Sequence, residues 1–348
     1  MKLQFAASLL CFCAFVAHAA GTPASKSPPA KPAAKTQAPA GKTVPRHFFV
    51  SGSAGGIAEI DLPAGWDISG RTSPIAMRMQ APGAPDKLQL TAFPISKDKI
   101  ALASDDKLRD MLSENGKSML KFSAETGFDI LPLPGARGFY FGLSDKALAG
   151  KPGGPDKFPF VHSGALRFGE WVGIFNVFSN EKQGRFVQES LAAAASLRWS
   201  APVPAAQGER AIAAMRFAAV PEGMTRKSEI NCVSPQAKML YDRFNDLYGP
   251  MLGTHTVKSS FESYDAGGGD AGSVLYMSFN LPVQNDLRAF VAGLLWHEAF
   301  PTREHPEEFF AAGSELVVWC TPVESRIKRL SQTRLEEALF PPAKSERR

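Results

Sequence analysis

Short stretches of alternating hydrophobic and polar residues dominate the first half of this chain. Alternation with a period of two places every second side chain on the same face of a β-strand. Segments with this pattern, or with an aromatic-rich apolar run, lie at 57–62, 75–79, 88–92, 138–143, 160–168 and 171–178. Gly169-Glu170 joins the last two and is a two-residue connection typical of a β-hairpin. The pattern therefore predicts a mainly antiparallel sheet in this half.

Two other segments of the first half repeat their hydrophobic residues at helical spacing. Residues 105–122 carry an apolar stripe, and Ser104 or Asp105 can cap the helix that the stripe predicts. The stripe consists of Leu108, Met111, Leu112, Met119 and Leu120. Residues 185–199 form the second predicted helix. Its inward side chains are Phe186, Val187, Leu191, Ala194 and Leu197.

The second half of the chain alternates strands and helices more regularly. Strands are predicted at 214–220, 257–264, 274–279 and 315–321, and helices at 234–249, 285–299 and 323–339. The glycine-rich segment 265–272 predicts a hairpin tip between the second and third of these strands. It lacks the lysine of a phosphate-binding loop and the alternating acids of a calcium loop.

A break that contains Pro202 and Pro204 divides the folded part of the chain. Residues 200–209 are predicted to be a linker between two domains, 47–199 and 210–341. The expected fold class is α+β, in which each domain packs helices on a mainly antiparallel sheet. Residues 342–348 follow as a basic tail.

The beginning of the chain has the pattern of an export signal. Lys2 precedes an apolar run at 5–16, and Ala17-His18-Ala19 is a small-x-small cleavage site, so residues 1–20 are predicted to be a signal peptide. Residues 21–46 are predicted to be a disordered linker, because Pro, Ala and Lys make up 16 of the 25 residues at 21–45. The apolar run is shorter than the roughly 20 residues that span a membrane. We expect a periplasmic or secreted protein with no transmembrane segment after cleavage.

The basic character of the chain belongs to its ends. The net charge is +5, of which Lys2 contributes +1, residues 21–46 contribute +5 and residues 344–348 contribute +2. Residues 47–343 therefore carry −3. Nucleic-acid binding needs a basic face on the folded domain itself. The charge distribution thus argues against nucleic acid as a partner.

Two cysteines remain after removal of the predicted signal, which contains the other two. Cys232 and Cys320 do not form a C-x-x-C pair, and an oxidising compartment favours a disulfide between them. A bridge over a loop of this size would contribute about 4 kcal/mol in the chain-entropy model. We therefore predict a Cys232–Cys320 disulfide.

A short motif near the start of the first predicted domain suggests a family. Leu62-Pro63-Ala64-Gly65-Trp66 resembles the opening of PsbP-like domains, and the late hairpin followed by a helix is similar as well. The likeness covers roughly residues 48–199. It implies an antiparallel sheet between helices and an accessory or binding role, and it transfers no catalytic residue. Trp66 itself is predicted to be a core residue.

The densest cluster of chemically active side chains lies at 296–308. His297 and Glu298 end a predicted helix, and His305 follows in a loop, so the three could hold a zinc ion with an open position for water. The second His of an H-E-x-x-H motif is replaced by Pro301. The alternative is a helix end without metal, followed by an acidic first turn of the next helix at Glu307-Glu308.

Trp296 lies on the polar side of the same predicted helix, opposite the apolar stripe. It is a candidate contact with the first domain or with a partner protein. Beyond this cluster, the sequence contains no G-x-S-x-G elbow and no set of residues that indicates a catalytic centre or a cofactor.

The sequence therefore favours an exported, non-catalytic binding or protein-interaction module whose partner is a protein or a component of the cell envelope. One alternative is a metal-dependent hydrolase built on His297, Glu298 and His305. Another is an envelope inhibitor or immunity protein with one tight protein partner.

Overall fold

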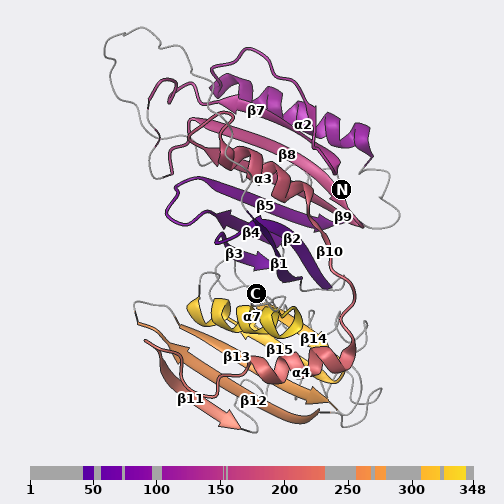
Figure 1. Ribbon diagram of the computed structural model, residues 1–348, viewed down its shortest axis with the longest axis vertical. Helices are drawn as coiled ribbons and strands as arrows, with labels where there is room; N and C mark the ends of the chain where they lie inside the picture. Colours follow the sequence, from indigo (N-terminus) through magenta and orange to yellow (C-terminus); the bar gives the residue numbers. More distant parts are fainter. Residues whose placement is uncertain are drawn as a thin grey trace, which may run out of the picture. The chain divides into compact units, whose positions relative to one another are not determined.

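The computed structural model describes ten stretches of the chain, namely 42–50, 56–72, 75–95, 104–151, 153, 156–231, 256–267, 271–279, 307–321 and 325–341. These residues form helices and three antiparallel sheets, which confirms the α+β fold class (Figure 1). Ala40–Arg348 make up one compact unit. The division at 200–209 into two domains therefore stays a prediction.

The largest sheet has seven strands in the order β3-β4-β5-β9-β8-β7-β6. Its strands are β3 Asp67–Thr72, β4 Ile75–Gln80, β5 Lys87–Pro94, β6 Leu131–Pro132, β7 Arg137–Ser144, β8 Phe160–Phe168 and β9 Trp171–Ser179. The predicted hairpin at Gly169 is confirmed, since β8 pairs with β9 in antiparallel register up to Phe168↔Trp171. Alternation in these strands gives the sheet two apolar faces, each with its own cluster of buried residues.

Helices cover parts of both faces of this sheet. Helix α2 (Asp105–Met119) lies over β7 and β8, continues into the short 3-10 helix η3 (Leu120–Phe122), and is capped by the Ser104 hydroxyl, which accepts a hydrogen bond from the Lys107 amide. Helix α3 (Arg185–Ala195) lies on the other side, where it packs on β9 and on strand β2 (Gly56–Pro63) of a neighbouring sheet. Trp66 is 4% exposed and stacks on Phe186 of α3 at 4.8 Å, which confirms that it is a core residue.

A three-stranded sheet contributes to two hydrophobic clusters at once. It consists of β1 (Thr43–Val50), β2 (Gly56–Pro63) and β10 (Arg198–Trp199), in the order β1-β2-β10. Successive side chains of a strand point to opposite faces. Phe48 accordingly joins the cluster of the seven-stranded sheet, whereas Phe49 joins the cluster around Trp319.

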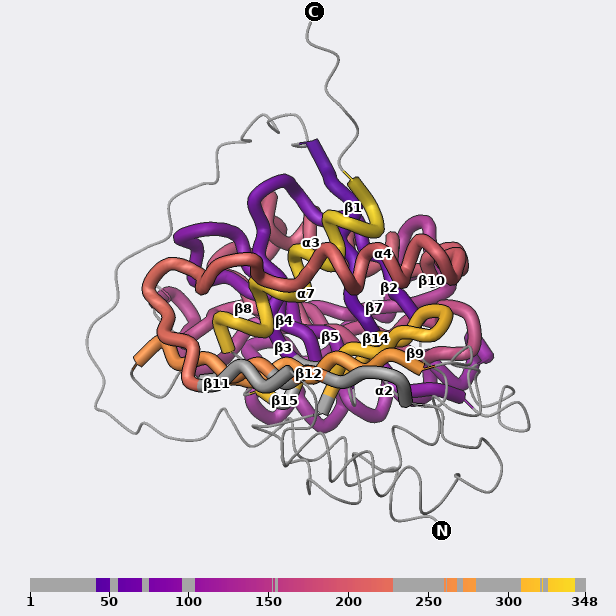
Figure 2. Tube along the Cα trace, turned by 90° about the horizontal axis from the view of Figure 1, so that it is seen from below, coloured from indigo at the N-terminus to yellow at the C-terminus, as the bar shows by residue number. Residues whose placement is uncertain are grey.

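The third sheet has five strands in the order β11-β12-β13-β15-β14. They are β11 Thr225–Asn231, β12 Thr256–Asp265, β13 Ala271–Phe279, β14 Glu307–Ala312 and β15 Glu315–Cys320. Helices α4 (Ala205–Met215) and α7 (Arg326–Leu339) pack against each other and against this sheet (Figure 2). The Trp319 indole is fully buried beneath them and donates to the Ser331 hydroxyl of α7 at 2.8 Å.

Several predicted boundaries are wrong. The linker predicted to reach residue 46 is already strand β1 from Thr43 onward, because Thr43–Arg46 pair with Asp61, Leu62 and neighbouring residues of β2. The helix predicted at 185–199 ends at Ala195, after which Arg198 and Trp199 pair with β2. In both cases pairing with β2 decides the outcome, and the residue pattern within the segment does not reveal that pairing.

Three further predictions in the second half also fail. Residues 205–209 are not linker and the strand predicted at 214–220 is absent, because a run of strong helix formers after Pro204 becomes α4, with Ala211, Ile212 and Met215 buried. Glu307-Glu308 does not begin a helix but starts β14, which pairs with β15. Within the described residues, the predicted strands 257–264, 274–279 and 315–321 and the helix predicted at 323–339 are present with shifts of a few residues.

Candidate functional site

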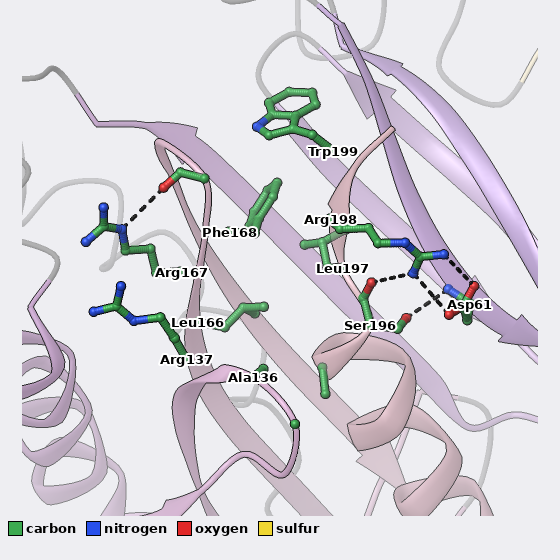
Figure 3. Close-up of a pocket in the computed structure, with 13 residues that line it drawn as sticks. Asp61, Ala136, Arg137, Leu166, Arg167, Phe168, Ser196, Leu197, Arg198 and Trp199 are labelled. Atoms are coloured by element: carbon green, nitrogen blue, oxygen red, sulfur yellow. Dashed lines mark hydrogen bonds and ion pairs between the residues drawn. The ribbon is translucent and has the colours of Figure 1, made fainter. Parts of the chain in front are cut away.

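An open groove of about 630 Å³ lies between the end of the β7–β8 hairpin and strand β10 (Figure 3). Three short segments line it, 135–137 before and at the start of β7, 166–169 at the end of β8, and 195–199 from the end of α3 into β10. Asp61 of β2 completes the wall beside β10. The groove is thus built where three segments distant in the sequence come together.

Apolar side chains form the bottom of the groove. Leu166, Phe168 and Leu197 are 1%, 5% and 5% exposed, because alternation along β8 turns Leu166 and Phe168 toward the core. The half-buried Trp199 adds an aromatic wall, with its ring 6.0 Å from that of Phe168 and 5.5 Å from that of Trp171. Aromatic contacts of this kind hold the side chains in fixed positions. The floor beneath the groove is therefore packed core, and of these side chains it is the half-buried Trp199 that is accessible from the groove.

Gly169 allows Trp199 to pack so closely on the β8–β9 turn. Its backbone has φ +58°, a region that favours glycine, and a Cβ built there would lie 2.9 Å from Cδ1 of Trp199. The positive φ and the close approach of Trp199 therefore both favour glycine at position 169. Any other side chain at this position would strain the turn and displace the indole from the groove.

Two arginines stand on the side of the groove formed by the hairpin. Arg137 of β7 and Arg167 of β8 are directly opposite each other in the antiparallel register. Like charges at such positions destabilise a sheet. Arg137 lies 3.8 Å from Asp105, and both side chains are exposed. Nε of Arg167 donates to the Gly169 carbonyl at 3.2 Å. Because Arg167 alternates with Leu166 and Phe168 along β8, both arginine side chains lie on the opposite face of the sheet, the face that α2 covers (Figure 3).

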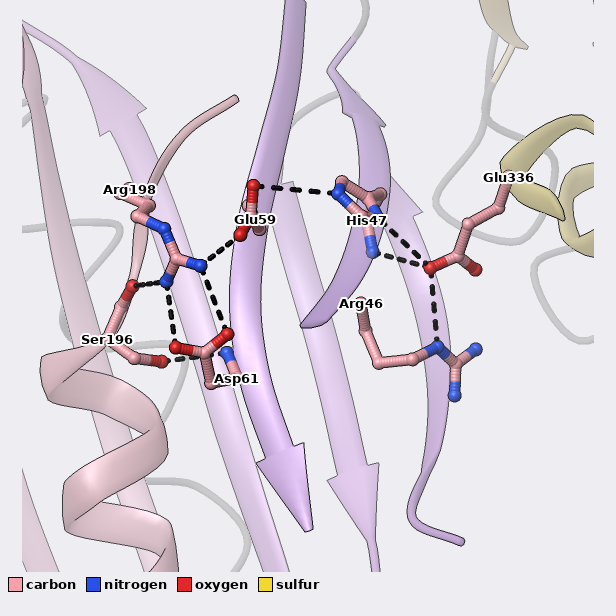
Figure 4. Close-up of polar contacts among 7 residues, drawn as sticks. All are labelled: Arg46, His47, Glu59, Asp61, Ser196, Arg198 and Glu336. Carbon is pink, nitrogen blue, oxygen red and sulfur yellow. Dashed lines mark hydrogen bonds and ion pairs between the residues drawn. The ribbon is translucent and has the colours of Figure 1, made fainter. Parts of the chain in front are cut away.

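The opposite wall holds a third arginine, whose guanidinium bonds to groups of its own chain. Arg198 forms a two-pronged ion pair with Asp61, with both N···O distances 3.0 Å, and donates to the Ser196 carbonyl at 2.8 Å (Figure 4). It also bonds Glu59, and these carboxylates raise the pKa of the guanidinium. The Ser196 hydroxyl accepts a hydrogen bond from the Asp61 amide at 2.8 Å. This wall is therefore rigid.

A chain of polar contacts continues from this wall to helix α7 (Figure 4). Nε2 of His47 lies 3.5 Å from Glu59, and its Nδ1 lies 3.2 Å from Glu336 of α7. The imidazole is 5% exposed and stacks on Phe340 at 3.6 Å. Burial acts to raise the pKa of Glu336, but hydrogen bonds from His47 and the charge of Arg46 outweigh burial, so the pKa is lowered. Strand β1 is thereby joined to α7.

The predicted metal site falls outside the described residues. Trp296, His297, Glu298 and His305 all belong to segments that the structure does not describe, so the zinc hypothesis and the partner contact stay predictions. Among the described residues, no group of three or more His, Cys, Asp or Glu side chains has the arrangement to hold a metal ion. In the same part of the chain, no helix has both the length and the apolar character that crossing a bilayer requires.

The disulfide prediction is equally open. Cys320 ends β15, whereas Cys232 lies just beyond the described residues that end β11. In the sheet, β12 and β13 separate β11 from β15. Mass analysis of the alkylated protein with and without reductant would test the bridge, and two free thiols in the exported protein would refute it.

Sequence reasoning did not identify the groove residues. Arg198 and Trp199 fell inside a predicted helix, and Arg137 lay one residue before a predicted strand. The available signal was the pairing of strands 138–143 and 160–168 as neighbours, which would have placed Arg137 near Arg167. That pairing depends on strand order, which periodicity does not provide.

Comparisons with known proteins add no family. No protein-family model matches the chain, and no curated protein matches it either. One similar solved structure is a protein from Bacteroides thetaiotaomicron VPI-5482, at 13% identity and TM-score 0.25 over 61% of this chain. The chain spans 62% of the length of that protein. Another is crystal form I of TP0453, at 8% identity and TM-score 0.18 over 75% of this chain and 79% of that one. Likenesses this weak identify neither the fold nor the function of the chain.

Proposed function

We propose that this chain is an exported binding or protein-interaction module and that the groove beside β10 is where it holds its partner. The observation that carries the proposal is the groove itself, which lies beside strand β10 and is lined by the half-buried Trp199 and by the Arg198–Asp61 ion pair. Ligand sites are typically concave and apolar with a few fixed polar groups. The rigid Arg198–Asp61 wall and the packed Trp199 supply such fixed positions.

The role of a binding module also agrees with the resemblance of residues 48–199 to PsbP-like domains, which implies an accessory or binding role. The predicted signal peptide and linker support a location in the periplasm or outside the cell. The partner would then be a protein or another component of the envelope. An envelope inhibitor or immunity protein is the form of this proposal in which the partner is a single protein bound tightly.

Site-specific photo-crosslinking in intact cells tests the proposal. A photoreactive amino acid is placed at Ala195 or Arg137, which line the groove, and at Val220 as a control that is 41% exposed elsewhere. We expect the groove positions to yield adducts of defined mass and the Val220 position to yield none of them. Equal adducts at all three positions, or none in the groove, would contradict the proposal.

Export is tested separately by fractionation and intact mass. We expect the protein in the periplasmic or extracellular fraction, with a chain that begins near Gly21. Recovery in the cytoplasm with the complete N-terminus would refute the signal prediction and would leave the groove proposal to be judged by crosslinking alone.

The zinc-hydrolase alternative has its own measurement. Protein purified without a histidine tag is analysed for metal, together with His297→Ala and His305→Ala variants. Stoichiometric zinc that disappears in both variants would favour the hydrolase. Protein without metal would remove that alternative.

A further inference from the structure

We infer that Arg216 and Arg334 form a binding site for a small oxyanion, a carboxylate or phosphate group, with the Tyr276 hydroxyl as a third donor. The site lies where helices α4 and α7 cover the five-stranded sheet (Figure 1). Its residues belong to other elements than those that line the groove beside β10. The inference therefore goes beyond the proposed function of the groove and does not depend on it.

Both arginines are held against aromatic rings. Arg216 follows the last residue of α4, and its Cζ lies 4.1 Å from the centre of the Tyr276 ring. Cζ of Arg334, on α7, lies 4.8 Å from the centre of the Phe217 ring. Both arginines are half-buried. A cation–π contact fixes the guanidinium through its charge, so its five N–H groups remain available for another partner.

Neither guanidinium has an anionic partner in the described part of the chain. Within it, Arg216 and Arg334 form no hydrogen bond and no ion pair. By contrast, Arg46, Arg185 and Arg198 each lie within ion-pair distance of at least one carboxylate. The planar fork of a guanidinium matches the oxygens of a carboxylate or phosphate. These two arginines therefore have both the chemistry and the free donors that an oxyanion requires.

The Tyr276 hydroxyl lies near both arginines. The side chain is fully buried, and its hydroxyl has no hydrogen-bond partner among the described residues. Burial raises the pKa of this hydroxyl, and so does the Glu262 carboxylate, whereas the charges of Arg216 and Arg334 act to lower it. The hydroxyl therefore stays protonated, and both guanidinium charges are close enough to act on it. A buried donor without a partner is costly, and an oxyanion would satisfy it.

A second buried hydroxyl lies on the same face of the sheet. Ser260 of β12 is directly opposite Tyr276, is 2% exposed, and likewise lacks a hydrogen-bond partner among the residues that the structure describes. Glu262 follows two positions later, and it accepts a hydrogen bond from the Tyr264 hydroxyl at 2.8 Å. Nη2 of Arg226 lies 3.5 Å from the same Tyr264 hydroxyl. The face thus combines buried hydroxyls with unpaired guanidiniums.

Arginine-specific modification with phenylglyoxal, followed at each site by mass spectrometry, tests the inference on the full chain. Acetate and inorganic phosphate are the probes, and chloride keeps the ionic strength constant. We expect saturating probe to slow the modification of Arg216 and Arg334 by about tenfold, with one apparent Kd for both. The exposed Arg210 of α4 is the internal reference and should react at an unchanged rate. The probe with the lower apparent Kd identifies the preferred oxyanion.

Variants separate binding from packing. Arg216→Gln should abolish the protection of Arg334, together with the rise in melting temperature that the preferred probe causes relative to chloride. Tyr276→Phe removes the hydroxyl alone and should raise the apparent Kd by about tenfold. Glu262→Gln removes a nearby negative charge and should lower the apparent Kd. Arg210→Gln is the matched control and should bind the probe like the unaltered chain. Melts without probe check that each variant folds.

Three outcomes would overturn the inference. They are no protection of Arg216 and Arg334 by either probe, equal protection of Arg210, and protection of Arg334 that persists in Arg216→Gln. Each would show that the two arginines only cover the rings of Tyr276 and Phe217. The first two are measured on the unaltered chain, so they decide even where a variant fails to fold. Crosslinking in the groove judges the proposed function separately.

Discussion

The seven-stranded and five-stranded sheets handle charged side chains in opposite ways. In the first, Arg137 and Arg167 face each other in neighbouring strands, and the Arg137 side chain is 65% exposed. In the second, Lys328 of α7 and Glu308 of β14 form an ion pair of 2.7 Å with side chains only 3% and 1% exposed. The exposed charges can still accept a ligand, whereas the buried charges are committed to each other.

The buried pair also joins elements of different sheets. Nζ of Lys328 donates to the Gly70 carbonyl of β3 at 2.9 Å, and Gln332 donates to Glu308 at 3.3 Å. The desolvation of two charges is costly, so a buried pair adds little net stability but is expensive to break. The comparison teaches that exposed charge in this protein stays open to solvent, whereas buried charge specifies how elements are held together.

The largest effect is expected from breaking the buried pair. Lys328→Met removes the ammonium group beside buried Glu308, so the free energy of unfolding should fall by about 3–5 kcal/mol. Urea denaturation monitored by tryptophan fluorescence measures the change. Lys328→Met/Glu308→Leu should recover most of the loss. A loss in the single variant below about 1 kcal/mol would show that the pair is solvated rather than buried.

A smaller effect is expected from filling the space of a core glycine in the seven-stranded sheet. A Cβ at Gly164 of β8 would lie 2.2 Å from Cζ of Phe175, whose side chain is fully buried. Gly164→Ala should therefore lower the free energy of unfolding by about 1–3 kcal/mol through overpacking. Gly127→Ala is the matched control, since nothing lies within 4 Å of its Cβ position. Equal stability of the two variants would contradict the described packing.

Acid should lower the stability of the fold around the seven-stranded sheet, because one carboxylate there, Glu125, loses its charge. Burial acts to raise the pKa of Glu125, but hydrogen bonds from Lys182, Ser123 and Ser144 outweigh burial and lower the pKa from 4.5 to about 2. Because the folded pKa lies below the unfolded one, this stabilisation is complete above about pH 4.5 and is lost as the pH falls toward 2.

Glu125→Gln tests this pH dependence. The variant should lose about 2 kcal/mol of unfolding free energy at pH 7, a value reduced for solvent screening of this partly exposed group. The loss should be much less at pH 2.5, because proton uptake by the unfolded state has already removed most of the contribution there. Denaturation curves at both pH values measure the difference. Glu114→Gln, an exposed control on α2, should show no such pH-dependent difference. A constant deficit for Glu125→Gln would refute the assignment.

The smallest effect on stability is expected at the facing arginines Arg137 and Arg167. Arg167→Gln relieves the repulsion from Arg137 and should raise the free energy of unfolding by about 0.3 kcal/mol. Arg185→Gln, which removes an i,i+4 pair with Glu189 at 2.7 Å, should lower it by a similar amount. Thermal melts should therefore show stability changes of opposite sign for the two variants. A loss of stability in Arg167→Gln would show that Arg137 and Arg167 stabilise the fold.

Elements with strong local periodicity were predictable from the sequence. Helix α2 with its Ser104 cap, the β8–β9 hairpin with its turn at Gly169, and the core position of Trp66 all follow from neighbouring residues. Their signals lie in side chains three or four apart on a helix or two apart on a strand. Such signals do not require knowledge of distant partners.

Strand β10 and the register of the arginines could not be predicted in this way. Arg198 and Trp199 continue a helical pattern, and they become strand only because β2 offers a ladder more than 130 residues earlier. Glu308 likewise carries no local sign of burial, since its partner Lys328 follows a further strand and the start of a helix. Strand order and long-range pairing are properties of the assembled core.

The amino-acid order alone was sufficient for the α+β class, the main periodic elements and the location of charge at the chain ends, because each depends on composition or on near neighbours. Packing decided the rest. It made the first half of β1 from residues assigned to a linker, placed Phe48 and Phe49 in two different hydrophobic clusters, and brought 135–137, 166–169 and 195–199 together into one groove. These features depend on which distant surfaces can be buried against each other, and no short window of sequence contains that information.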